Sequence, residues 1–329
     1  MSRRASIVVV VLFACALIAG CGGDDGDEAA NKPPPAADPA EFPKANGQTL
    51  AALRDGLGEG GPVLAPSVLV LTSGDNRFGF GLFERDRSQI ADASVVVYVA
   101  PAGGGPAKGP YPARYESLEV KPSFQSRTSA QDPDSAKSVY VADIPFDKPG
   151  KYEVLGIARL DDRLVAATSA SGPLSVMKPG NDPVPRVGRP APRIHTPTKA
   201  DVAGDLASID TRVPPSTMHE ADFADVVGKK PVVLLFATPA LCQSRVCGPV
   251  VDVAEQVKHE HEGDVEFIQM EIYRDNSIEK GFRPQVAAFR LPTEPWLFVI
   301  DKQGKVAARL EGAFSAGELE DALGKVSKG

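Results

Sequence analysis

One stretch of the sequence, residues 230–249, constrains the fold more than any other. It begins with an uninterrupted apolar run at 232–237, which is typical of a strand buried on both faces in an α/β sheet. A helix pattern begins at Pro249, because apolar residues then recur at intervals of three and four, and proline suits a first helical turn. Two cysteines, Cys242 and Cys247, therefore lie between the end of a buried strand and the start of a helix.

This placement matters chemically because a helix N-terminus favours negative charge. It lowers the pKa of a nearby thiol and makes that thiol a better nucleophile. When a thiolate attacks a substrate disulfide, a second thiol close by must resolve the mixed disulfide that forms. A loop of this length can bring two cysteines within the reach of a disulfide. The alternative is a static Cys242–Cys247 disulfide that staples the loop.

Residues 1–20 predict a targeting segment. Two arginines precede an apolar core at 7–19 that is too short to be a convincing membrane span. The core ends in small residues before Cys21, an arrangement that resembles the bacterial lipobox. The resemblance implies cleavage before Cys21 and attachment of lipid to it. We therefore expect a lipoprotein on the extracytoplasmic face of the cell membrane, with an ordinary secretory signal as the alternative.

The four cysteines of the chain then reduce to one pair. Cys15 leaves with the leader and Cys21 carries lipid, so only Cys242 and Cys247 remain in a compartment where disulfides persist. The formal net charge of −7 argues against nucleic-acid binding, which needs a basic surface.

Changes in composition and pattern predict two globular domains. An acidic, proline-rich stretch cannot bury enough apolar surface to fold, and a second proline-rich stretch reads as a semi-rigid spacer. The predicted limits are a signal peptide at 1–20, a disordered tether at 21–48, a β-sandwich at 49–178, a linker at 179–200 and a C-terminal domain at 201–329.

The first domain shows the pattern of short strands. Phe78, Phe80 and Leu82 alternate with other residues, and turn signals recur between about eight such segments. Residues 149–154 resemble the start of strand F in immunoglobulin-like domains, so the expected fold is an all-β immunoglobulin-like sandwich. It contains no catalytic constellation, and we expect it to be a scaffold.

The C-terminal part has the expected order β-α-β-α-β-β-α and resembles the thioredoxin-like superfamily, nearest its extracytoplasmic redoxin-type members. The resemblance implies an α/β thioredoxin-like domain in which Pro295 forms a cis peptide and faces the active cysteines. It is carried by four segments in the order of the family, 187–192, 223–236, 294–301 and 312–319.

The cysteine motif departs from that family, which has C-x-x-C. Here the spacing is C-x₄-C, and Cys247-Gly248-Pro249 looks like the family's C-G-P-C with its second cysteine lost. This alignment implies that Cys247 attacks and Cys242 resolves. Leu235 stands where the family has a buried acid, which removes one proton-handling group. Arg245, between the cysteines, is a candidate to stabilise a thiolate.

A second resemblance is to peroxiredoxins of the bacterioferritin-comigratory type, in which Cys242 would be the peroxidatic cysteine. Those enzymes have a threonine three residues before that cysteine, whereas Thr238 lies four before it. They also have an arginine just ahead of the strand that follows Pro295, and Arg290 is the only nearby candidate.

A third alternative is copper binding, since thiolates are soft ligands and copper-delivering relatives combine two cysteines with a distant histidine. Only His219 precedes the central strand closely enough to approach the cysteines, and no histidine follows His261. The single tryptophan, Trp296, is interpreted as a core residue.

The sequence therefore predicts a membrane-anchored thiol–disulfide oxidoreductase with Cys247, Cys242 and Pro295 at its site and a protein dithiol or disulfide as its substrate. No metal and no cofactor are expected. The competing interpretations are the peroxidase and a non-enzymatic binding module with a structural disulfide.

Overall fold

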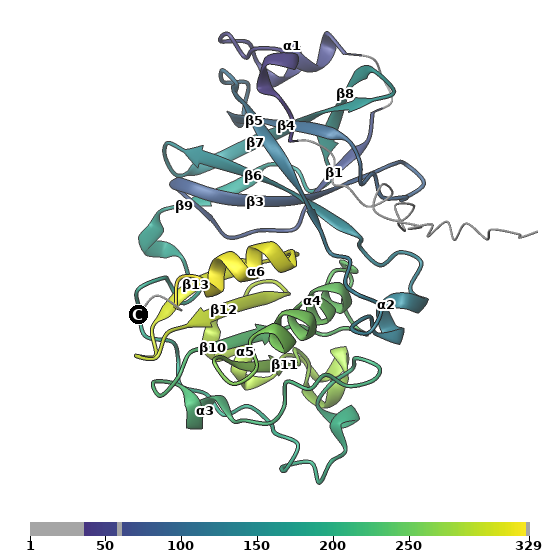
Figure 1. Ribbon diagram of the computed structural model, residues 1–329. Helices are drawn as coiled ribbons and strands as arrows, with labels where there is room; N and C mark the ends of the chain where they lie inside the picture. The colour runs from purple at the N-terminus through teal and green to yellow at the C-terminus, as the bar shows by residue number, and fades with distance from the viewer. Residues whose placement is uncertain (1–35, 58–60, 327–329) are drawn as a thin grey trace, which may run out of the picture. The chain divides into compact units, whose positions relative to one another are not determined.

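The N-terminal half of the chain builds a barrel of seven strands (Figure 1). The structure is a computed structural model, and it describes residues 36–57 and 61–326. The hydrogen-bonded order is β7-β4-β5-β6-β3-β1-β8, and β8 pairs again with β7, which closes the ring. The barrel strands are β1 (Val63–Pro66), β3 (Gly74–Phe83), β4 (Ser94–Pro101), β5 (Lys108–Ser117), β6 (Ser138–Phe146), β7 (Gly150–Leu160) and β8 (Arg163–Ser169).

Strand β4 shows why these residues form a barrel wall. Val95 and Val97 point into the barrel core, whereas Val96 and Tyr98 point outward and are equally buried. The outward side chains are covered by helix α1 (Leu50–Asp55) and by the residues before it. A continuous β-branched run therefore occurs because both faces of this strand are buried.

Residues 36–48, predicted to belong to a free tether, lie against the outside of this wall. Phe42 is 4% exposed, and the guanidinium of Arg159 lies 5.8 Å from its ring centroid. The hydroxyl of Tyr98 donates to the carbonyl of Pro43. This part of the predicted tether is therefore folded onto the barrel.

The C-terminal part contains a four-stranded mixed sheet in the order β11-β10-β12-β13. Strands β10 and β11 are parallel, and the other two pairs are antiparallel. The elements of this part are α3 (Phe223–Val226), β10 (Val232–Phe236), α4 (Cys247–Glu260), β11 (Glu266–Met270), α5 (Pro284–Phe289), β12 (Trp296–Ile300), β13 (Val306–Glu311) and α6 (Ala316–Leu323).

Strand β10 is buried on both faces, as its apolar run predicts. Val233 and Leu235 pack with α4 and α6, whereas Leu234 and Phe236 pack on the opposite face with α5. The predicted alternation of strands and helices in this part is observed, and helix α4 begins at Cys247. The strand and the helix thus place both cysteines at one end of the sheet.

The barrel and the C-terminal sheet share one core. Val139 and Val141 of β6 belong to the same apolar cluster as α4 and α6. Arg77 of β3 pairs with Glu318 of α6 at 2.6 Å, and both side chains are largely buried. The domain limits at 178 and 200 stay predictions, although Val184 of the predicted linker is 1% exposed.

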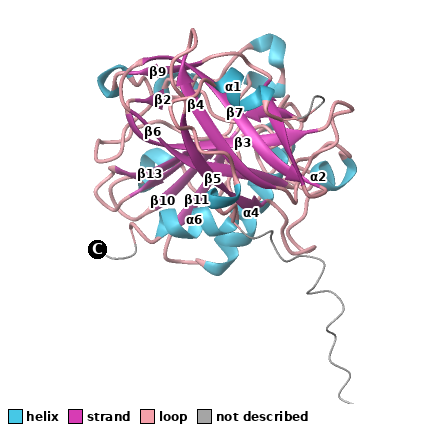
Figure 2. Cartoon of the chain, turned by 90° about the horizontal axis from the view of Figure 1, so that it is seen from above, coloured by secondary structure: helices cyan, strands magenta, loops and turns pink. Residues whose placement is uncertain are grey.

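The predicted fold class, an α/β thioredoxin-like domain preceded by an immunoglobulin-like sandwich, is wrong. The described chain is mostly strand, with a closed seven-stranded barrel and few helices (Figure 2). The physical reason is that sandwiches and barrels share the same alternation of inward and outward residues. Closure depends on pairing between distant strands, such as Val63 of β1 with Thr168 of β8, and local patterns do not report it.

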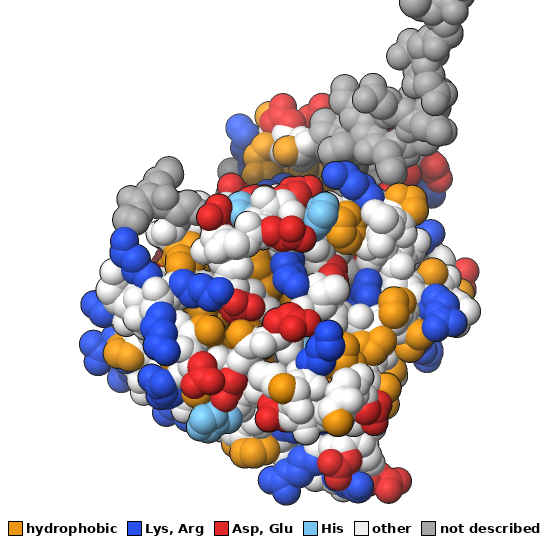
Figure 3. All heavy atoms as spheres, turned by 60° about the horizontal axis from the view of Figure 1, so that its bottom comes forward, with side chains coloured by type: hydrophobic (Ala, Val, Ile, Leu, Met, Phe, Trp, Pro, Cys, Tyr) orange, Lys and Arg blue, Asp and Glu red, His pale blue; other side chains and the backbone are white. Residues whose placement is uncertain are grey.

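Two shorter strands, β2 (Leu71–Thr72) and β9 (Leu174–Met177), pair in parallel and extend the sheet beyond β7. Helix α2 (Arg127–Gln131) lies between β5 and β6 and approaches α4. On the face drawn in Figure 3, acidic and basic side chains are interspersed over much of the surface, and Lys and Arg side chains gather toward the left edge.

Candidate functional site: a buried pair of thiols

The two predicted cysteines lie next to each other beside a carboxylate that the sequence analysis did not single out. The sulfurs of Cys242 and Cys247 and a carboxylate oxygen of Glu294 all lie within 4.8 Å of one another. Cys242 lies in the loop after β10, and Cys247 is the first residue of α4. Glu294 lies two residues before the start of β12. Three separate segments therefore meet at the N-terminus of one helix.

Both thiols are free in the structure, so the predicted Cys242–Cys247 disulfide is not formed in it. The Cys247 thiol instead hydrogen-bonds to the sulfur of Cys242. Their burial differs: Cys242 is 8% exposed, whereas Cys247 is 0% exposed. Only the first of the two sulfurs is open to a visiting molecule.

The surroundings of Cys242 favour its thiolate. The hydrogen bond from Cys247 is the largest of the influences that lower the pKa of Cys242 to about 6, and burial opposes it. The Ser244 hydroxyl, 3.3 Å away, and the backbone amides of Cys247 and Val246 contribute further hydrogen bonds. Because two of these donors belong to the start of α4, the helix N-terminus stabilises the charge of this sulfur.

Cys247 has the opposite character. Burial raises the pKa of the Cys247 thiol well above its usual range, and the neighbouring Cys242 raises it further. The backbone amide of Thr238 is the one group there that favours its thiolate. This geometry favours Cys242 as the attacking thiol and Cys247 as the resolving one, which is the reverse of the roles predicted from the sequence.

Glu294 is a half-buried acid beside the two sulfurs. Burial, followed by the negative charges of Cys242 and Glu271, raises the pKa of Glu294 to about 7. The peptide bond between Glu294 and Pro295 is cis, as the sequence resemblance implied. The position before that proline is the only signal in the sequence that pointed to Glu294.

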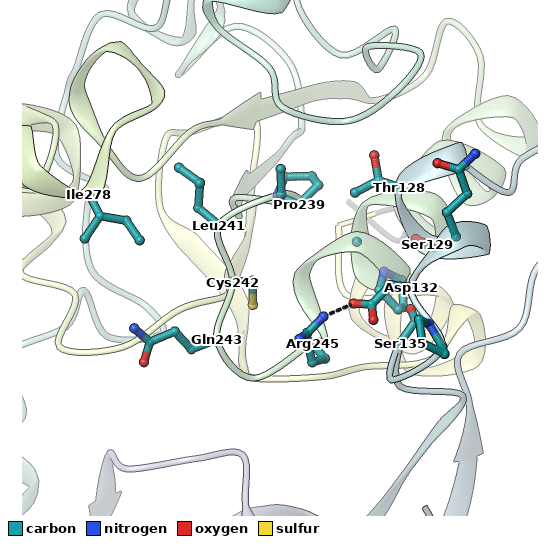
Figure 4. Close-up of a pocket in the computed structure, with 15 residues that line it drawn as sticks. Thr128, Ser129, Asp132, Ser135, Pro239, Leu241, Cys242, Gln243, Arg245 and Ile278 are labelled. Carbon is teal, nitrogen blue, oxygen red and sulfur yellow. Dashed lines mark hydrogen bonds and ion pairs between the residues drawn. The ribbon is translucent and has the colours of Figure 1, made fainter. Parts of the chain in front are cut away.

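A cavity of about 790 Å³ opens beside Cys242 (Figure 4). Cys247 does not line it. One part of its wall comes from the loop around Cys242, and another from α2 and the residues after it, which belong to the barrel. The barrel was expected to be a scaffold only, and this contribution to the site was not predicted.

Arg245 lies in the left-handed backbone region, with φ of 61°. Its guanidinium pairs with Asp132 at 2.6 Å (Figure 4). The negative charge of Cys242 also contributes to the raised pKa of Arg245. The candidate role of Arg245 near the thiolate is therefore compatible with its position, but its closest partner is a carboxylate of the barrel.

The other predicted residues fall outside the thiol pair. His219 is buried and bonds to Asp210 at 3.0 Å, and it does not belong to the Cys242–Cys247–Glu294 group. Arg290 is exposed at the end of α5, and Thr238 is buried with no hydrogen bond to its hydroxyl. Trp296 is 1% exposed and stacks on Phe298, which confirms it as a core residue.

Two thiolates and a carboxylate are also donors that a thiophilic ion such as Zn²⁺ accepts. Among residues 36–57 and 61–326, the group formed by Cys242, Cys247 and Glu294 is the only one with three clustered donors of this kind. A fourth ligand would have to enter from the cavity.

The low pKa of Cys242 predicts a characteristic pH dependence of alkylation. Because the thiolate is the nucleophile, the rate with iodoacetamide should fall as the pH drops through about 6 and level off above it. An ordinary cysteine would show its midpoint at about 8.5. Mass spectrometry of the peptide containing Cys242 measures the rate. Cys247→Ala removes the largest stabilising hydrogen bond and should move the midpoint upward, and a wild-type midpoint near 8.5 would contradict the assignment.

No family model matches the chain, and no curated protein matches it. Among solved structures, the chain is similar to a protein from Chlorobium tepidum that carries the provisional description thiol:disulfide interchange protein DsbE. The two are 17% identical over 43% of this chain and 99% of that chain, with a TM-score of 0.32.

The predicted lipid-attachment residue, Cys21, lies outside the described residues. Within 36–57 and 61–326, every helix is too short or too polar to cross a membrane.

Proposed function

We propose that this protein is a thiol–disulfide oxidoreductase that uses Cys242 and Cys247. The observation that carries the proposal is the pair of free, adjacent thiols at the N-terminus of α4, of which only Cys242 opens on a cavity. A merely structural pair would need neither a stabilised thiolate on one sulfur nor access to it from solvent.

The reaction has two steps. The Cys242 thiolate attacks one sulfur of a substrate disulfide, a new S–S bond forms between them, and the first substrate thiolate leaves. Cys247 then attacks the sulfur of Cys242, the bond to the substrate breaks, and the second substrate thiolate leaves. The substrate gains two electrons and the protein is left with a Cys242–Cys247 disulfide. The same steps in reverse oxidise a substrate dithiol.

The second step requires Cys247 to lose its proton in a buried place. Glu294 is the nearest acid, and a pKa of about 7 leaves a large fraction of its carboxylate ionised at neutral pH. A base whose pKa lies near the working pH is suited to this transfer. We propose that Glu294 is the base that accepts the proton of the Cys247 thiol, and that the Thr238 amide stabilises the thiolate that remains.

We also propose that the reaction takes place on the extracytoplasmic face of a membrane, with the chain attached through lipid on Cys21. The sequence of residues 1–21 supports this location. In such a compartment disulfides persist, and a protein dithiol or disulfide would be available as a substrate.

The direct test mixes the fully reduced protein with excess 5,5′-dithiobis(2-nitrobenzoate) and follows release of thionitrobenzoate in a stopped-flow instrument. We expect two equivalents per protein in two phases, the first from attack by Cys242 and the second from resolution by Cys247. Mass spectrometry should then show a Cys242–Cys247 disulfide with no reagent attached. Release of only one equivalent, with the reagent still bound, would refute the proposal.

Glu294→Gln adds a test of the proton transfer. The second phase should slow by about 100-fold at neutral pH, at the lower end of what general acid–base catalysis contributes. The rise of the wild-type second phase as the pH passes through about 7 should disappear. The first phase should not slow, because removal of a negative neighbour favours the Cys242 thiolate. Glu262→Gln, near the opposite end of α4, is the matched control.

A further inference from the structure

The connection between β5 and β6 leaves the barrel and extends to the thiol pair. We call residues 118–137, which include α2, the β5–β6 segment. Leu118 packs in the core that contains α4, and the amide of Lys121 donates to the side chain of Gln256 in that helix at 2.8 Å. A long connection of a barrel therefore lies along the helix that begins with Cys247.

A buried ion pair holds this segment in place. Arg212 donates from Nε to Asp252 of α4 at 2.8 Å, and both side chains are almost fully buried. Arg212 also donates to the carbonyl of Phe124, and the other oxygen of Asp252 accepts from the amide and hydroxyl of Ser126 at 3.1 Å. Because charge-assisted hydrogen bonds in a buried place are strong, the segment is fixed relative to α4.

Further contacts bring the segment to the edge of the cysteine loop. The amide of Ala136 donates to the carbonyl of Arg245 at 3.1 Å, and Asp132 pairs with the guanidinium of Arg245. At the start of α4, a Cβ atom added to Gly248 would lie 2.8 Å from the hydroxyl oxygen of Ser129. Glycine at this position therefore lets α2 approach the helix closely.

The resulting cavity has two unlike walls. Figure 4 shows Leu241 and Ile278 on one side of Cys242 and the hydroxyls of Thr128 and Ser135 on the other. Ile278 is 47% exposed, which is high for a large apolar side chain. The charges of Asp132 and Arg245 neutralise each other, so the cavity presents no unpaired charge from these two residues to attract a small ion.

We propose that the β5–β6 segment is a substrate-binding wall, and that the substrate is an extended polypeptide segment carrying the disulfide. The inference rests on the proposed function, since the peptide must present its sulfur to Cys242. Backbone groups of a polypeptide fit the wall that carries the hydroxyls of Thr128 and Ser135. An apolar side chain beside its cysteine fits the wall with Leu241 and Ile278. A cavity of about 790 Å³ also exceeds what a single thiol side chain requires.

The test compares two probes that share one leaving group. One is a ten-residue peptide whose only cysteine forms a mixed disulfide with thionitrobenzoate, and the other is free cysteine with the same group attached. The variant Gln131→Trp places a bulky ring at an exposed position of α2 that lines the cavity. Ala130→Trp, exposed on the same helix but outside the cavity lining, is the matched control.

We expect Gln131→Trp to lower the ratio of the rate constants, peptide over free cysteine, by about tenfold, which corresponds to the loss of one good interface contact. Ala130→Trp should leave the ratio as in the wild type. An unchanged or raised ratio in Gln131→Trp would overturn the inference while the proposed chemistry stands. If the wild-type protein releases thionitrobenzoate from neither probe, the proposed function itself fails.

Discussion

Replacing Cys242 by serine is expected to abolish disulfide exchange, whereas replacing Cys247 by serine is expected to turn the protein into a trap for its substrate. Cys242 carries the stabilised thiolate and opens on the cavity. A serine hydroxyl does not replace a thiolate as nucleophile, so reduction of insulin by Cys242→Ser should fall by at least about 1,000-fold.

Cys247→Ser keeps the attacking thiol and a hydroxyl that can still donate to it. The first step should therefore proceed, and the mixed disulfide should accumulate because nothing resolves it. Non-reducing electrophoresis and intact mass measure the adduct. If Cys242→Ser accumulates the adduct instead, the roles are those predicted from the cysteine motif, with Cys247 attacking.

Local features of the site could be predicted from the sequence. The apolar run of β10 is buried on both faces, helix α4 begins at Cys247, and the bond before Pro295 is cis. The first two follow from the pattern of neighbouring residues, and the cis bond was implied by the family resemblance of its segment. The same kind of information places two thiols at one helix N-terminus, which is enough to suggest redox chemistry.

The order in which the thiols act could not be obtained in this way. The helix N-terminus acts on both cysteines, and what separates them is burial: Cys247 is fully enclosed and Cys242 is not. Burial depends on how distant segments pack, and alignment of one motif contains no such information; it gave the attacking role to Cys247, whereas the proposal made here gives it to Cys242.

Glu294 and the barrel were missed for a related reason. Glu294 is far from both cysteines in the sequence, and only the pairing of β10 with β12 brings it to them. The β5–β6 segment reaches α4 because the barrel closes and packs on the C-terminal sheet. Both features arise from long-range pairing, which alternation of apolar residues does not encode.

The ion pair between Arg212 and Asp252 should carry a large share of the stability that joins the barrel to the thiol site. Asp252→Ala leaves the Arg212 guanidinium buried without its carboxylate and removes the acceptor for Ser126. Loss of one partner from a buried pair costs about 3–5 kcal/mol. We expect the free energy of unfolding, measured by urea denaturation, to fall by that amount.

Two variants of the same helix separate charge from packing. Asp252→Asn keeps acceptor oxygen and shape, and should cost less than Asp252→Ala. Glu260→Ala removes an exposed partner of Lys121, 3.6 Å away, and should cost less than about 1 kcal/mol. If Asp252→Ala costs no more than Glu260→Ala, the buried pair does not hold the β5–β6 segment against α4. The position of this segment beside Cys242 would then depend on its remaining contacts, namely the packing of Leu118 and the hydrogen bonds of Lys121 and Ala136.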